Sequence, residues 1–186
     1  MSTPFPFIAG AISLCFVDTV SGRGTRNVER LKTSDDLSRW FGESKVIHGL
    51  EVCVTETELN EARYLREAIH DWSDLLIGEA SPGPHLVALV NSAAGQAPPR
   101  PHFENGALQF RAANPFRAAL SAVAEDALTI FALQPSSVRK CPECRMVFLD
   151  TSRPGRRIWC SSSTNCGNRL RVRAFRARQS HPEGEA

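Results

Sequence analysis

The sequence contains no long uninterrupted apolar run, and this absence argues against a membrane span. The two longest apolar stretches, residues 5–20 and 116–133, are broken by charged side chains at Asp18, Arg117, Glu125 and Asp126. The chain begins Met-Ser-Thr-Pro-Phe-Pro, without basic residues before its first apolar run, so a secretory signal is not expected. We therefore expect a cytoplasmic protein with no membrane partner, in which reduced thiols hold metal rather than form disulfides.

The motifs of common enzyme classes are also missing. The sequence has no GxGxxG fingerprint, no Walker loop and no GxSxG nucleophile elbow. Its five histidines are scattered without a surrounding motif: His48, His70, His85, His102 and His181. We therefore assign no catalytic residue and do not expect an enzyme, and a hydrolase or oxidoreductase is kept only as an alternative without a supporting motif.

Charge is present, but it is distributed unevenly along the chain. Residues 1–138 hold 11 Lys and Arg against 16 Asp and Glu, and residues 139–186 hold 11 against 4, so the formal charges are −5 and +7. A basic segment of this density favours a polyanionic partner. The alternative is that the basic segment docks on the acidic body of the same chain.

Local patterns predict an α+β body with about three main helices and a few strands. Strands are expected at residues 8–20 and 45–54, where Cys15 and Cys53 would be buried free thiols. A short helix is expected after Thr33, and a long one after the capping box that Thr55 begins. Further signals predict a short helix near residues 86–90, a strand at residues 107–111 after an Asn-Gly turn, and a long helix from residue 115.

The charge and the patterns together suggest three segments. We expect an N-terminal mixed domain at residues 1–136 and a small treble-clef-like zinc finger at residues 137–180. Residues 181–186 are expected to be a disordered tail.

Four of the six cysteines form the most specific pattern in the sequence. Their spacing is C-x2-C, then fifteen residues, then C-x5-C: Cys141, Cys144, Cys160 and Cys166. Zinc takes four soft ligands in a tetrahedron, and four thiolates close a structural site. We predict one structural zinc ion, with residues 147–149 and 157–159 as the two arms of a hairpin between the cysteine pairs. A redox pair formed by Cys141 and Cys144 is the rival interpretation.

The second cysteine pair has an x5 loop where a plain ribbon has x2. This predicts that Cys166 binds the metal from the first turn of a following helix, at the helix's positive end. The order of knuckle, hairpin and ligand-bearing helix is that of a treble-clef finger.

The residues around Cys166 carry a family resemblance. Cys166-Gly167-Asn168-Arg169, together with residues 148–152 and 156–160, resembles the signature of the CGNR zinc-finger proteins. In that family the finger follows an ABATE domain, and residues 14–20 and 108–114 are similar to parts of it. The resemblance implies a stress-induced transcription regulator or an RNA-binding protein. The loop between the last two cysteines is one residue longer than the common family spacing.

The helix expected after Cys166 is rich in arginine, which suits bidentate contacts to phosphate or guanine. Val172 and Phe175 are expected to pack against the hairpin or the body. Gly167, Asn168 and Trp159 are taken as structural, with Asn168 capping or orienting the helix start. The candidate nucleic-acid contacts are Arg153, Arg156, Arg157, Arg169, Arg171, Arg173, Arg176 and Arg178.

These observations predict a two-part regulator. The zinc finger contacts nucleic acid, with DNA favoured over RNA, and the N-terminal domain serves as sensor or dimerisation unit. The partners considered are therefore DNA or RNA, a second copy of the chain, and an unidentified small-molecule effector of the N-terminal domain. A finger that docks on another protein is the alternative function.

Overall fold

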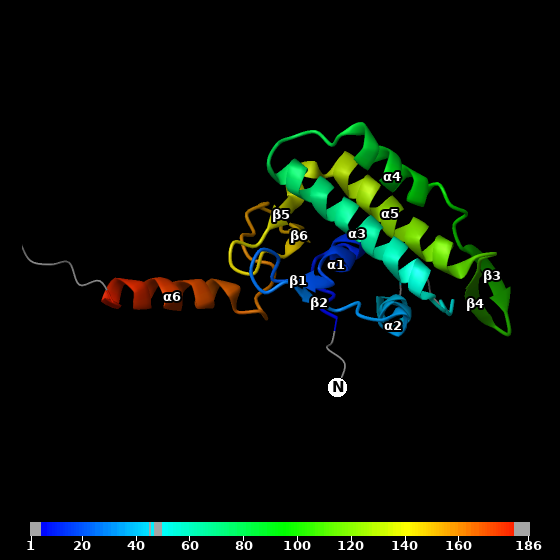
Figure 1. Cartoon of the computed structure of the whole chain (residues 1–186), viewed down its shortest axis with the longest axis horizontal. Helices are drawn as coiled ribbons and strands as arrows, with labels where there is room; N and C mark the ends of the chain where they lie inside the picture. Colours follow the sequence, from blue (N-terminus) through cyan, green and yellow to red (C-terminus); the bar gives the residue numbers. More distant parts are fainter. Residues whose placement is uncertain (1–4, 45, 47–49, 181–186) are drawn as a thin grey trace, which may run out of the picture.

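Helices dominate the body of the protein, and a cysteine-bearing unit with one projecting helix follows it (Figure 1). The structure, a computed structural model, describes residues 5–44, 46 and 50–180. Its elements in chain order are α1 (Ile12–Val17), β1 (Val20–Ser21), β2 (Val28–Glu29), α2 (Ser34–Ser44), α3 (Glu56–Ile77), α4 (Pro84–Ala94), β3 (Arg100–Glu104), β4 (Ala107–Arg111), α5 (Pro115–Leu133), the 3-10 turn η1 (Pro135–Ser137), β5 (Val138–Lys140), β6 (Val147–Leu149) and α6 (Cys166–Ser180).

The core lies where α3 and α5 run side by side, and α1 and α4 each pack against both (Figure 1). Its largest fully buried side chains include Trp40, Phe16, Phe116, Leu14 and Leu59. The strands pair two by two into antiparallel ribbons. The α+β architecture predicted from the sequence is therefore confirmed. No helix of the described residues has the length and apolar character to cross a bilayer.

The two long helices begin where local signals predict them. Thr55 and Glu58 form a reciprocal capping box, with Glu58 N–H donating to Thr55 Oγ1 at 3.3 Å and Thr55 N–H donating to Glu58 Oε2 at 2.8 Å. At the start of α5, Asn114 Oδ1 accepts the backbone N–H of Arg117 at 2.9 Å. Both helices bury one stripe of apolar side chains, which fixes their rotation about the core.

The strand predicted at residues 8–20 is wrong: this segment contains α1. Residues 13–17 are all buried, so the apolar run shows no periodicity that could separate helix from strand. Gly10, at φ +84°, bends the chain before the helix. The start of α1 is then tied to α5, because the N–H and hydroxyl of Ser13 both donate to Asp126 Oδ2, at 2.8 and 2.5 Å.

The strand predicted at residues 45–54 is not found either. Residues 45 and 47–49 lie outside the described residues, and residues 50–54 form no strand. Cys53 is exposed, not buried as expected, because no strand of the described residues covers the segment that carries it.

The Asn-Gly turn is confirmed. Asn105 and Gly106 both have positive φ, at 52° and 77°, and they join β3 to β4. The strand at residues 107–111 was expected, whereas β3 was not.

The predicted hairpin between residues 147–149 and 157–159 is also wrong, because β6 pairs with β5. The other edge of β6 is occupied by the N-terminal part of the chain. Leu149 N–H donates to the carbonyl of Ala9 at 2.7 Å, and Val147 N–H donates to Asp18 Oδ1 at 3.2 Å. With both edges taken, β6 offers no ladder to residues 157–159.

Candidate metal centre and basic helix

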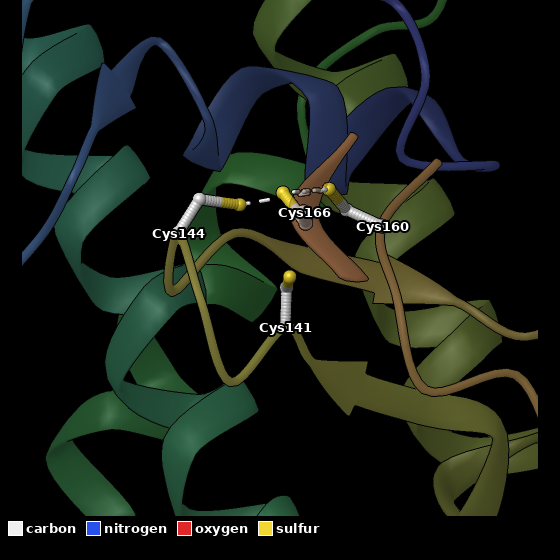
Figure 2. Close-up of side chains that lie close together, drawn as sticks. All are labelled: Cys141, Cys144, Cys160 and Cys166. Atoms are coloured by element: carbon white, nitrogen blue, oxygen red, sulfur yellow. Dashed lines mark hydrogen bonds between the residues drawn. The ribbon is translucent and has the colours of Figure 1, made fainter. Parts of the chain in front are cut away.

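Three pieces of the chain bring the four cysteines together. Cys141 and Cys144 lie in the tight turn after β5, which is closed by Arg145 N–H donating to the carbonyl of Cys141 at 2.9 Å. Cys160 comes from the loop after β6, and Cys166 is the first residue of α6. Figure 2 shows the four side chains converging with their sulfur atoms innermost.

The sulfur geometry fits one zinc ion. All four Sγ atoms lie within 4.8 Å of one another, and the pairs Cys144–Cys160 and Cys160–Cys166 are 3.5 and 3.7 Å apart. A tetrahedron with zinc–sulfur bonds of about 2.3 Å has edges of roughly 3.8 Å. Cys141, Cys160 and Cys166 are buried, and Cys144 is half-buried. A closed set of four thiolates is the donor set of a structural zinc site, so this cluster can hold one zinc ion.

Thiols at this spacing cannot all ionise by themselves. Cys141 accepts hydrogen bonds from Cys144 and Cys160, which lowers its pKa. The same contacts with Cys141 raise the pKa of Cys144, and they raise that of Cys160 to about 11. A second negative charge is opposed by the first, so the cluster needs a cation before all its sulfurs become thiolates.

Two neighbours, Arg169 and Thr164, support the sulfur atoms, a role that was not predicted for either of them from the sequence. Arg169 Nη2 donates to Cys166 Sγ at 3.0 Å, and the Thr164 hydroxyl lies 3.3 Å from Cys160 Sγ. Hydrogen bonds of this kind orient metal ligands and stabilise their charge. The only local signal for this contact of Arg169 is its place three residues after Cys166 in the C-G-N-R sequence, because residues three apart in a helix lie on the same face.

Trp159 and Gly167 pack directly on each other. A Cβ atom on Gly167 would lie 3.0 Å from the indole ring of Trp159, so only glycine leaves room for the ring at the start of α6. Asn168 is exposed, and its side chain makes no hydrogen bond with the described residues. The cap expected from Asn168 is therefore not formed; Asn165, at φ 53°, turns the chain into the helix instead.

The candidate arginines fall into two groups. In the first, the guanidinium is held within the finger. Arg157 stacks on the Phe148 ring at 4.5 Å, and Arg171 Nε donates to the carbonyl of Gly167 at 3.3 Å. Arg169 and Arg173 both pair with Glu143, whose side chain is only 8% exposed in the turn between Cys141 and Cys144.

In the second group the side chains are exposed and pair with no acidic group of the described residues: Arg153, Arg156, Arg176 and Arg178. The alternative that the basic helix docks on the acidic body is not realised, since α6 points away from the body helices (Figure 1). For the same reason Val172 and Phe175 are 40% and 54% exposed, and the expectation that they pack on the hairpin or body is wrong.

The cysteine-bearing turn is fastened to the body on two sides. Lys140 forms an ion pair with Asp74 of α3. Asp18 is buried beside α1, and its Oδ1 accepts the backbone N–H of Val147. The four-cysteine cluster is therefore anchored on the helical body, and α6 projects from it (Figure 1).

Comparison with known families agrees with these two parts. Residues 10–133 match the ABATE family, which is described as a "putative stress-induced transcription regulator", and residues 138–179 match the CGNR zinc finger. These are a regulator family and a zinc-finger family, not enzyme families. No curated protein matches the chain.

Proposed function

Because this chain belongs to the ABATE family and carries a CGNR zinc finger, we propose that it is a stress-induced transcription regulator that contacts nucleic acid through its finger. In this proposal Cys141, Cys144, Cys160 and Cys166 are the zinc ligands, and the metal is structural. The finger spans residues 137–180, and the body, residues 1–136, acts as sensor or dimerisation unit.

The observation that carries the proposal is the projecting basic helix. All five arginines of α6 are exposed, and α6 lies clear of the acidic body. Arg176 and Arg178 have no acidic partner among the described residues. Exposed guanidinium groups on one helix attract a polyanion and can release its condensed counterions.

We favour DNA over RNA on the shape of this element. Helix α6 has 15 residues, so it is roughly 22 Å long, and it projects away from the body helices (Figure 1). An unobstructed helix of this size can enter the major groove of duplex DNA, whereas the deep, narrow major groove of duplex RNA excludes it.

The proposal predicts a measurable salt dependence. If about six phosphates are contacted, the logarithm of the binding constant for duplex DNA should fall with the logarithm of salt at a slope of about −5. Arg176→Gln/Arg178→Gln should reduce that slope by about 2, because each lost phosphate contact removes about one counterion. Fluorescence anisotropy with labelled duplex DNA and single-stranded RNA measures both.

The matched control is Arg26→Gln/Arg100→Gln, which removes two exposed arginines from the body and should leave the slope unchanged. If both double variants changed the slope equally, DNA binding would depend on the net charge of the protein and not on α6. An absence of binding to either polymer at 50 mM salt would contradict the proposal.

One observation favours a second candidate, a finger that docks on a protein. Val172 and Phe175 are exposed one turn apart on α6, and exposed apolar side chains mark protein contacts when they cluster. In that case Phe175→Ser would abolish binding of the partner, and Arg176→Gln/Arg178→Gln would have little effect.

A further inference from the structure

The body contains a cavity lined by residues of α3, α4 and α5, the three helices that pack together in Figure 1. Its volume is about 390 Å³, within the range of sites that bind small molecules. Because three packed helices form its walls, the cavity exists without rearrangement of the fold.

The floor of the cavity is apolar. Leu65 of α3 and Leu120 of α5 are buried beneath it, and Leu89 of α4 lines its side. Ala88 and Ala93 of α4 also line the cavity, and their small side chains leave space that larger residues would fill. An apolar floor of this kind contributes affinity through area removed from water and selects an apolar ligand body.

The mouth of the cavity carries an ion pair between Glu61 and Arg117, and the cation of this pair is in an unusual position. Arg117 lies in the first turn of α5, where the helix dipole disfavours a cation. Its Nη1 pairs with Glu61 of α3, and its side chain is 43% exposed. The remaining guanidinium donors have no hydrogen-bond partner among the described residues, so they are available to a ligand.

A second polar group faces the same space. The hydroxyl of Tyr64 lies 3.5 Å from Nε2 of His85, which belongs to the first turn of α4. Both residues line the cavity. The first turns of α4 and α5 contain no acidic residue. The positive ends of both helices are therefore left without a countercharge from their own first turns.

We propose that this cavity binds a small, mostly apolar organic acid as its carboxylate anion. The carboxylate accepts hydrogen bonds from Arg117, and the apolar part lies over Leu65, Leu89 and Leu120. A ligand with an ammonium group would pair with Glu61 and displace Arg117 from it. Arg117 would then lie unpaired beside the positive end of α5, which is unfavourable. This inference rests on the sensor role in the proposed function and names the chemistry of the signal.

The test uses 2-naphthoate as the probe and the uncharged 2-naphthamide as its comparison. Titration of the full-length zinc-loaded protein is followed by ¹H–¹⁵N NMR. Naphthoate should bind with a dissociation constant on the order of 1 mM or tighter and shift amides of Tyr64, Leu89 and Arg117. Naphthamide should bind about tenfold more weakly or worse, because it loses the charge-assisted hydrogen bonds.

Two variants test the cavity from opposite sides. Arg117→Gln should weaken naphthoate about tenfold and leave naphthamide unchanged. Ala88→Trp should abolish binding of both by filling the space above Leu89. Their controls are Arg111→Gln, which breaks an exposed ion pair on β4, and Asn91→Trp, which places the same ring on an exposed site of α4 outside the cavity.

Three results would overturn the proposal. The first is no amide shift at naphthoate concentrations up to 5 mM, and the second is equal binding of the acid and the amide. The third is amide shifts that depend only on protein concentration, which would show that a second copy of the chain occupies the cavity. If Arg117→Gln fails to fold, the comparison of acid with amide and the Ala88→Trp variant still decide. Duplex DNA binding is measured on the same samples, so loss of DNA binding with intact naphthoate shifts would remove the proposed function and leave the cavity assignment standing.

Discussion

The cysteine side chains of this chain have different surroundings, and these separate metal ligands from ordinary thiols. Cys15 is buried in α1, where burial raises its pKa to about 11 and makes it unreactive. Cys53 is exposed and does not belong to the group of four cysteines. The remaining four, from Cys141 to Cys166, share one cluster with sulfur atoms at the spacing of a zinc tetrahedron.

Cys160→Ser should therefore release the metal. We expect about one equivalent of zinc in the purified wild type and less than about half an equivalent in the variant, because a hydroxyl is a poor replacement for a thiolate ligand. Elemental analysis measures the metal directly. Cys53→Ser, which removes a thiol outside the cluster, should keep the full equivalent, and equal zinc content in all three proteins would rule out this ligand set.

The carboxyl group of Asp18 predicts a pH dependence. Burial raises the pKa of Asp18 well above its ordinary value. The hydrogen bond from the backbone N–H of Val147 favours the anion and lowers the pKa, but its effect is smaller than that of burial. An acid whose pKa is higher in the folded chain stabilises the fold when protonated. This contribution is complete below about pH 4 and is lost as the pH rises through the raised pKa.

Asp18→Asn keeps the acceptor for Val147 N–H and cannot ionise. The free energy of unfolding of Asp18→Asn, relative to wild type, should therefore increase as the pH rises above about 4. Urea unfolding at several pH values gives this difference. Asp35→Asn, which removes an exposed carboxyl group on α2, is the control for the loss of one carboxyl group. A pH-independent difference for Asp18→Asn would show that the pKa of Asp18 is the same in the folded and the unfolded chain and would contradict the prediction.

Helix α6 projects from the finger and does not pack on the body helices (Figure 1). Its first two turns are attached to the finger, where Cys166 reaches the cluster and Arg169 and Arg173 pair with Glu143. Both arginine side chains are more than half exposed, so solvent screens these pairs and each contributes little to global stability. Their effect is local: they fix the direction in which the helix leaves the finger.

Glu143→Gln tests this attachment. The global free energy of unfolding should change by less than about 1 kcal/mol. Amide hydrogen exchange in residues 167–173 should accelerate by up to about fivefold, which corresponds to that free energy. Glu104→Gln, which breaks an exposed pair with Arg111 on the β3–β4 ribbon, should leave exchange in α6 unchanged. No acceleration in Glu143→Gln would mean that zinc alone orients the helix.

At the level of the whole molecule, the family boundary between body and finger is not a structural gap. Val147, Phe148 and Leu149 of β6 belong to the same buried core as the helices. On the edge that does not pair with β5, the backbone of β6 forms a hydrogen bond with the backbone of Ala9, and Lys140 forms an ion pair with Asp74 of α3. The four-cysteine cluster is therefore anchored on the core of the body.

Removal of zinc by a chelator should consequently unfold only part of the chain. Residues 160–180 should lose their protection from hydrogen exchange, because a segment of this size has no core without the metal. Residues 59–69, 116–131 and 147–149 should remain protected, since their contacts are within the body core. Exchange followed by mass spectrometry resolves these segments. Cooperative unfolding of the entire chain would contradict a body that is stable by itself.

Local chemistry was enough to predict several features. The capping box at Thr55, the Asn114-Pro115 helix start and the Asn105-Gly106 turn depend on neighbours within four residues, so they could be predicted without knowledge of the fold. The cysteine spacing likewise predicted a metal cluster with Cys166 at a helix start, because zinc geometry restricts which spacings can converge.

Other features depended on contacts far apart in the sequence. Residues 12–17 form a helix because α3 and α5 surround them, and a fully buried segment carries no periodic pattern. The partner of β6 was decided by Ala9 and Asp18, which lie more than 120 residues away and occupy one of its edges. The cavity mouth likewise pairs Glu61 with Arg117 across two helices. The sequence by itself determined the metal cluster and the long helices, because these follow from local spacing. Tertiary structure alone decided where the finger docks and which arginines face solvent, because those depend on which distant segments cover each surface.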